Sequence, residues 1–216
     1  MNTENLLFQS CLGVVLAGGK SSRMGQDKAH LQRNQQDMLS YSKSLLKDAG
    51  SSHVIVSGDE HGVSDIVSNI GPLGGIQSVI RQFKPKALLV LPIDLPLMTA
   101  EELAKLKQIG ELSQSACFFA DNYLPLYLPV NAFVEQFFQQ PLQLKSISKT
   151  SDSNLPSTKK NSSKRGLSGP SVRSLIKQIP HKVIQANSSN SLFNTNTPEQ
   201  WQQAQHLLSL QRKTHV

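Results

Sequence analysis

The most constraining feature of this sequence is an apolar run at residues 87–93, Ala-Leu-Leu-Val-Leu-Pro-Ile, in which apolar and polar side chains do not alternate. A strand that is apolar on both faces belongs in the middle of a sheet covered on both sides, as in parallel α/β sheets. Short apolar runs alternate with longer amphipathic segments along the rest of the chain. This order predicts an α/β fold with three layers, in which helices cover both faces of a doubly wound, mostly parallel sheet.

The same periodicity predicts the remaining elements. We expect further strands at residues 12–17, 53–57, 115–120, 123–130 and 182–186, and helices at residues 38–48, 73–83, 100–109, 132–139 and 171–178. The pair Asp121-Asn122 forms the turn between the strands at 115–120 and 123–130. Capping boxes beginning at Thr99 and Thr197 mark two helix starts, so that Thr99 and Glu102 are each expected to accept a backbone N–H. The second box opens a final helix that runs to about residue 210.

The composition is that of a single globular domain spanning residues 1–216, with 38% hydrophobic and 17% charged residues. The formal net charge is +7, and residues 145–168 carry +5 of it through six basic residues and one acid. This stretch also holds eight serines and almost no large apolar side chains, so we interpret it as a flexible insertion. Because basic runs are usually solvated, RNA binding is kept only as an alternative for this insertion.

Several classes of protein and site are excluded. No apolar run approaches the roughly 18 residues of a membrane span, and the N-terminus lacks the basic region of a signal peptide, so we expect a cytoplasmic protein. Cys11 and Cys117 are the two cysteines, each within an expected strand, so we expect reduced core residues and no disulfide framework or Cys-rich zinc site. The six histidines show no metal-binding spacing of the H-x-x-x-H or H-E-x-x-H type.

The first candidate for chemistry is the stretch Leu16-Ala-Gly-Gly-Lys-Ser-Ser-Arg-Met-Gly-Gln-Asp-Lys28, which begins where the first strand ends. Gly18 and Gly19 let the backbone approach a ligand closely, and successive N–H groups in such a turn form a nest for phosphate oxygens. Arg23 and Lys28 are spaced to reach a polyphosphate. A structural turn with solvated basic residues explains the same pattern.

Two common nucleotide-binding motifs are absent from this stretch. A Walker A loop needs a glycine five positions before Gly19, where this chain has Val14. A G-x-G-x-x-G pattern is also missing, so a dinucleotide-binding fold of the dehydrogenase type has no support.

The second candidate is Asp94, which follows the central strand and lies between Pro92 and Pro96. Open α/β sheets bind ligands at the carboxyl ends of their strands. Capping of the next helix is the alternative role, but Thr99 already holds that position. A single carboxylate there suits one or two bonds to Mg²⁺, whose other ligands are waters and substrate phosphates.

Two further motifs are weaker. Gly71-Pro-Leu-Gly-Gly75 is a turn into a helix whose N-terminus can host a base or an anion. Asn194-Thr-Asn196-Thr-Pro-Glu199 places two amides before a capped helix, where they could bind a polar heterocycle or a phosphate. Ordinary turn chemistry explains these asparagines equally well.

Taken together, the motifs resemble the molybdenum cofactor guanylyltransferases. The first motif alone indicates only the wider group of nucleotidyltransferases that make sugar and pterin nucleotides, with a nucleotide-diphospho-sugar transferase-like fold. The Asn-Thr-Pro-Glu motif in a chain of this length points to the pterin branch. The four motifs span Leu16 to Glu199, which is nearly the whole chain.

The resemblance implies a Mg²⁺-dependent enzyme that transfers GMP from GTP to the terminal phosphate of molybdopterin and releases pyrophosphate. It implies that the nucleotide is cradled by Leu16, Ala17, Gly18 and Gly19, that Arg23 and Lys28 offset the phosphate charge, that Asp94 holds Mg²⁺, and that Asn194 and Asn196 face the pterin. Such a transfer needs little beyond positioning and charge neutralisation, since the nucleophile is already an anion. Other cofactor-biosynthesis proteins and molybdoenzyme chaperones are implied as partners.

The chain departs from the family pattern at two nucleotide-associated positions. Ser57 stands where the family commonly has asparagine, and Asn69 is the nearest match to an aspartate before the Gly-Pro-Leu motif. An amide at position 69 can donate as well as accept, whereas a carboxylate only accepts, so reading of the guanine edge can differ. Two alternatives therefore stay open: a related transferase that uses CTP or a sugar phosphate, and a non-catalytic molybdopterin carrier.

Overall fold

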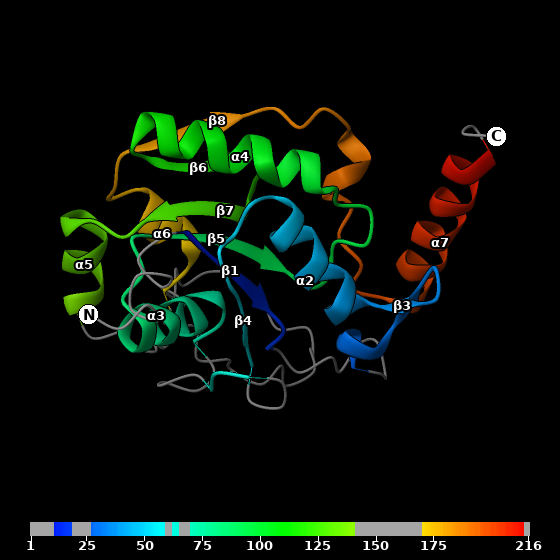
Figure 1. Cartoon of the computed structure of the whole chain (residues 1–216), viewed down its shortest axis with the longest axis horizontal. Coiled ribbons are helices and arrows are strands. Elements are labelled where there is room, and N and C mark those ends of the chain that lie inside the picture. The colour runs from blue at the N-terminus through cyan, green and yellow to red at the C-terminus, as the bar shows by residue number, and fades with distance from the viewer. Residues whose placement is uncertain (1–10, 19–26, 59–61, 65–69, 141–169, 214–216) are drawn as a thin grey trace, which may run out of the picture.

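A six-stranded sheet forms the centre of the molecule (Figure 1), as seen in a computed structural model that describes residues 11–18, 27–58, 62–64, 70–140 and 170–213. The strand order across the sheet is β4-β1-β5-β7-β6-β8. The strands are β1 (Cys11–Leu16), β4 (Val54–Ser57), β5 (Ala87–Pro92), β6 (Ala116–Phe119), β7 (Asn122–Pro129) and β8 (His181–Ile184). Strand β1 pairs in parallel with β4 and β5, and β6 pairs in parallel with β8. Strand β7 is antiparallel to both of its neighbours, so it runs against the other five.

Helices cover both faces of this sheet and bury two separate apolar clusters. Helices α2 (Met38–Asp48) and α4 (Ala100–Ser113) pack on one face, and α3 (Pro72–Phe83), α5 (Ala132–Gln139) and α6 (Val172–Ile176) pack on the other. Alternate residues of β1 point to opposite faces, so that Val15 joins the first cluster while Leu12 and Val14 join the second. Fully burying one such side chain contributes roughly 2 kcal/mol. The three-layer, doubly wound α/β prediction is therefore confirmed.

Helix α7 (Pro198–Lys213) lies at the opposite end of the view from α5 (Figure 1). Its first turn is capped as expected: Gln200 N–H donates to Thr197 Oγ1 at 3.4 Å, and Gln200 Oε1 accepts from Thr197 N–H at 3.2 Å. Trp201 packs into the cluster on the α2/α4 face, so the helix start is fixed to the body.

The prediction that the Glu102 side chain completes the capping box at Thr99 is wrong. Thr99 Oγ1 accepts from Glu102 N–H at 3.3 Å, as predicted for the start of α4. The Glu102 side chain does not return to Thr99. It is 2% exposed, and its Oε1 instead accepts the N–H groups of Asn187 and Ser188 at 2.5 and 3.1 Å. Glu102 thus ties α4 to the segment between β8 and the short 3₁₀ helix η2 (Ser189–Leu192).

Helix α4 runs to Ser113 rather than ending at residue 109, and Gly110 lies inside it. A Cβ at this position would collide with the ring of Tyr127 on β7, so the glycine is a packing residue and not a helix stop. The helix ends where Gln114 adopts a left-handed conformation, with φ of 50°.

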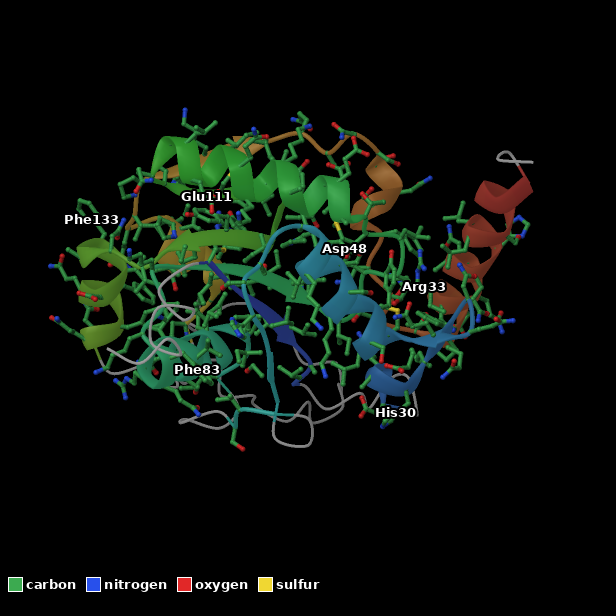
Figure 2. All side chains as sticks on the ribbon, viewed as in Figure 1. His30, Arg33, Asp48, Phe83, Glu111 and Phe133 are labelled. Atoms are coloured by element: carbon green, nitrogen blue, oxygen red, sulfur yellow. The ribbon has the colours of Figure 1, made fainter. Side chains whose placement is uncertain are left out.

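A 3₁₀ helix η1 (Lys28–His30) and a hairpin of β2 (Gln32–Arg33) and β3 (Gln36–Asp37) precede α2, and the sequence pattern predicted neither. Arg33, labelled in Figure 2, fixes this hairpin to the body of the molecule. Its Nε donates to the carbonyl of Pro96 at 2.6 Å, and its guanidinium lies 3.6 Å from the centre of the Tyr41 ring. The hairpin and η1 are thereby held beside the loop that follows β5.

Cys11 and Cys117 are buried free thiols, as predicted. Burial raises the pKa of Cys11 to about 12 and that of Cys117 to about 11. None of the helices in the described ranges could span a lipid bilayer. The predicted insertion at residues 145–168 lies outside the described residues.

Candidate active site

The candidate site lies where β1 and β5 end at the same edge of the sheet. Leu16 and Pro92 are partners in the parallel ladder, and Ile93 N–H donates to the Leu16 carbonyl at 3.2 Å. The residues that follow each strand, including Gly18 and Asp94, therefore meet in one cavity of about 410 Å³. The cavity is lined by Leu16, Ala17, Gly18, Lys28, Pro72, Pro92, Ile93, Asp94, Leu95, Asn122, Leu124, Asn194 and Asn196.

The glycine turn after β1 is held by backbone hydrogen bonds to Ser57. The N–H groups of Ala17 and Gly18 donate to the Ser57 carbonyl at 2.8 and 3.2 Å. These two N–H groups are therefore engaged within the protein and are not available to a phosphate. Gly58, with φ of 149°, permits this close approach, because a Cβ there would lie 2.9 Å from Gly18 N.

The side chain of Ser57 does not line the cavity. Ser57 is 2% exposed and is not among the residues that line the cavity. Its hydroxyl packs against Gly75 of α3, where a Cβ would collide with it. Ser57 thus supports the site through its backbone carbonyl. Three other predicted site residues, Gly19, Arg23 and Asn69, lie outside the described residues.

Lys28 is the central cation of the described site. Its Nζ lies 3.2 Å from Asp94 Oδ2 and donates to Asn196 Oδ1 at 2.8 Å. The side chains of Lys28 and Asp94 are 15% and 19% exposed, so water only partly screens this ion pair. Asp27 caps η1 by accepting Ala29 N–H at 3.0 Å, which sets the backbone from which Lys28 extends.

The loop before α7 is anchored directly on the Asp94 backbone. Thr195 is buried, and its N–H and hydroxyl both donate to the Asp94 carbonyl, at 2.9 and 3.2 Å. Asn196 Nδ2 donates to Asn194 Oδ1 at 3.0 Å, and Asn196 N–H donates to Gln200 Oε1 at 2.7 Å. These bonds bring both predicted asparagines to the same cavity as Lys28 and Asp94.

The second oxygen of Asp94 is the feature that fits a metal ion. Oδ1 is buried and has no hydrogen-bond partner in the described part of the molecule. A buried, unpaired carboxylate oxygen is costly unless a cation or a donor completes it. Among the described residues no group of three or more His, Cys, Asp and Glu side chains could hold a metal. A single carboxylate oxygen of this kind can serve as one ligand of a hard cation such as Mg²⁺, whose other ligands are waters and phosphate oxygens.

Sequence reasoning missed the part of the cavity wall that comes from β7. The sequence pattern predicts Asn122 only as a turn residue and Leu124 as a strand residue, whereas both line the cavity. Because β7 is antiparallel to β5, its first residues lie at the edge where the parallel strands end. If the direction of β7 had been known, Asn122 and Leu124 could have been placed in the site.

Comparison with known proteins identifies the family of this chain. Residues 13–152 match the family model described as the MobA-like NTP transferase domain. The chain is 36% identical to a molybdenum cofactor guanylyltransferase of Xanthomonas euvesicatoria over 201 residues, which cover 90% of this chain and 94% of that protein. It is 26% identical to a probable molybdenum cofactor guanylyltransferase of Peptoclostridium acidaminophilum, covering 88% and 86% of the two chains.

Its fold is shared with a solved structure, molybdopterin-guanine dinucleotide biosynthesis protein A of Archaeoglobus fulgidus. The TM-score is 0.62 at 18% identity, over 92% of this chain and 98% of that one. With the matched family model covering more than half of the chain and a relative above 30% identity aligned along most of it, the chain belongs to the MobA-like NTP transferases, the family of the molybdenum cofactor guanylyltransferases, and is a nucleotidyltransferase.

Proposed function

We propose that this protein transfers the GMP part of GTP to the terminal phosphate of molybdopterin, forming the guanine dinucleotide of the cofactor and pyrophosphate. The names of its relatives support the choice of substrates. The observation that carries the proposal is that the end of β1, Lys28 and Asp94 line one cavity of about 410 Å³. This brings a glycine turn, a cation and a carboxylate together, and no serine, threonine, cysteine or histidine is among the described residues that line the cavity.

The reaction requires only these groups in the site. An oxygen of the molybdopterin phosphate forms a bond to the α-phosphorus of GTP, and the bond from that phosphorus to the bridging oxygen breaks, so that pyrophosphate leaves with the bonding electrons. Because the attacking oxygen is already an anion, no general base is required. The protein accelerates the step by aligning the two substrates and by neutralising their charges.

Lys28 supplies positive charge on the triphosphate side. In the structure its ammonium is paired with Asp94 and Asn196. A triphosphate that enters the cavity offers the ammonium phosphate oxygens in their place. Arg23, from the same sequence motif, is proposed to act with it.

Asp94 is proposed to hold Mg²⁺ through its unpaired Oδ1. Asn196 Oδ1, which accepts a hydrogen bond from the Lys28 ammonium, is a second side-chain oxygen that contacts this ammonium. When bound, Mg²⁺ neutralises charge on the triphosphate and polarises its phosphorus centres. We place the reaction in the cytoplasm and propose that the product passes to other cofactor-biosynthesis proteins and molybdoenzyme chaperones.

The test is pyrophosphate release by the purified protein with molybdopterin, Mg²⁺ and each of GTP, ATP, CTP and UTP in turn. We expect release with GTP, and its loss by at least about 100-fold in Asp94→Asn and Lys28→Ala, as when a group that stabilises transition-state charge is removed. Asp48→Asn at the exposed end of α2 (Figure 2) and Lys105→Ala on α4 are matched controls and should retain activity.

Other outcomes would contradict the proposal in whole or in part. Consumption of CTP instead of GTP would make the chain a related transferase with another base preference. Binding of molybdopterin without consumption of any triphosphate would make it a carrier. Full activity in Asp94→Asn would refute the metal role given to this carboxylate.

A further inference from the structure

Asn122 lies in the cavity but belongs to none of the sequence motifs. It is the first residue of β7, and both it and Leu124 line the cavity wall. In the sheet, β5 lies between β1 and β7, so Asp94 at the end of β5 separates the glycine turn from Asn122. The cavity therefore has one side formed by the β1 turn and Lys28 and a second side formed by the start of β7.

In both asparagines of the loop before α7 the amide oxygen already accepts a hydrogen bond within the protein, while Asn194 Nδ2 donates in no hydrogen bond among the described residues. Asn196 uses Oδ1 to accept from Lys28 and Nδ2 to donate to Asn194. Asn194 Oδ1 is occupied by that second bond. Asn122 differs, because its Nδ2 donates to the Ala120 carbonyl at 3.3 Å, while Oδ1 makes no hydrogen bond within the described residues. The fixed Nδ2 orients the amide and leaves an acceptor oxygen for a ligand.

The start of β7 offers a heterocycle both kinds of contact that it needs. Asn122 supplies a hydrogen-bond acceptor, and Leu124 supplies apolar surface two residues further along the strand. A pterin ring has a conjugated apolar face and, on its 2-amino-4-oxo edge, N–H donors that an amide oxygen accepts. Tyr123, the residue between them, packs against Phe118 at 5.3 Å between ring centres and does not line the cavity.

We infer that Asn122 binds the pterin ring of the acceptor substrate and contributes to its selection. This inference rests on the proposed function, in which the triphosphate occupies the side of the β1 turn and Lys28. The acceptor then occupies the other side of Asp94, where Asn122 and Leu124 lie. Guanine carries the same pattern of N–H donors as the pterin, so the experiment has to separate the two substrates.

The experiment measures kcat and KM for molybdopterin and for GTP separately in Asn122→Ala and Asn122→Ser, with Tyr123→Ala as the control from the same strand. Loss of one hydrogen bond should raise the KM for molybdopterin about fivefold to tenfold in Asn122→Ala. The KM for GTP should stay within about twofold, which also reports that the variant is folded. Asn122→Ser, which keeps a shorter acceptor, should fall between, and Tyr123→Ala should change neither KM.

Equilibrium binding of molybdopterin without nucleotide gives an independent readout. The dissociation constant should rise by the same factor in Asn122→Ala and stay unchanged in Tyr123→Ala. An unchanged molybdopterin affinity, or a rise in the KM for GTP alone, overturns the assignment. If the wild-type protein consumes no triphosphate, the proposed function fails while this binding comparison still decides the role of Asn122.

Discussion

Replacing Lys28 by methionine should strengthen the binding of a divalent cation to the nucleotide-free protein. In the structure the Lys28 ammonium lies 3.2 Å from Asp94 Oδ2, so a metal ion that binds Asp94 has to compete with this cation. The attraction between unit charges at that distance is about 1.3 kcal/mol in water and about 5 kcal/mol at an effective dielectric constant of about 20. Because both side chains are less than one fifth exposed but not fully buried, we expect a net value of about 1.5–3 kcal/mol after solvent screening, or roughly 10- to 100-fold in affinity.

Manganese is a suitable probe, because free Mn²⁺ is measured directly by electron paramagnetic resonance while the protein is titrated. Lys28→Met should bind Mn²⁺ more tightly than the wild type, and Asp94→Asn should bind it more weakly. With GTP present, Lys28→Met should bind Mn²⁺ more weakly than the wild type. The Lys28 ammonium then faces phosphate oxygens, and its loss weakens the ternary complex of protein, Mn²⁺ and GTP. Lys105→Met is the control, because Lys105 contacts only the carbonyl of Gln185 and the amide of Asn187 in the described structure.

The refuting result is an equal Mn²⁺ affinity in Lys28→Met and the wild type. It would show that the ion pair does not compete with the metal. A similar gain in Lys105→Met would mean that general positive charge, rather than this contact, sets the affinity. Either result would remove the argument that Lys28 and the cation exchange places on Asp94.

Three further predictions concern packing and burial. Glu102→Ala should lower the free energy of unfolding by about 2–4 kcal/mol in urea titrations, because two backbone N–H groups lose their acceptor; an unchanged midpoint would contradict the anchoring role. Gly110→Ala should destabilise by about 1–2 kcal/mol, since overpacking against Tyr127 exceeds the gain in helix propensity, and Tyr127→Leu in the same chain should recover most of the loss; stabilisation by the single change would refute the packing argument. Burial raises the pKa of Cys11 to about 12 and that of Cys117 to about 11, so the folded state keeps protons that the unfolded chain releases above pH 9. The contribution of the two thiols to the free energy of unfolding should therefore be fully present below pH 9 and should be lost as the pH rises toward 12. Both thiols should also resist a thiol reagent at pH 8 until denaturant is added, and rapid labelling of the native protein would contradict their burial.

The regular elements were predictable because local signals and tertiary packing agree there. Helices α2 and α5 begin and end at the expected residues, and the central strand is buried on both faces, as its unalternating pattern indicates. The β2–β3 hairpin could not be predicted, since its strands have two residues each and show no periodicity. Its turn is formed by Asn34 and Gln35, both with positive φ, and glutamine gives no sequence signal for that conformation.

The candidate site was predictable where its residues follow parallel strands. The ends of β1 and β5 meet because paired parallel strands end at one edge, so Gly18 and Asp94 could be placed together from the sequence. The parts that were missed depend on relations between strands or on the backbone. Asn122 reaches the cavity only because β7 runs in reverse, and Ser57 contributes a carbonyl, which no side-chain motif reveals.

The contact between Lys28 and Asn196 joins residues 168 positions apart, and Thr195 reaches Asp94 across 101 positions. A nascent polypeptide therefore lacks the amide partner of Lys28 until nearly all of the described chain has left the ribosome. Truncated translation products that contain the glycine turn and Asp94 would hold an unfinished pocket. The lining of this cavity is therefore complete only in chains whose synthesis has passed residue 196.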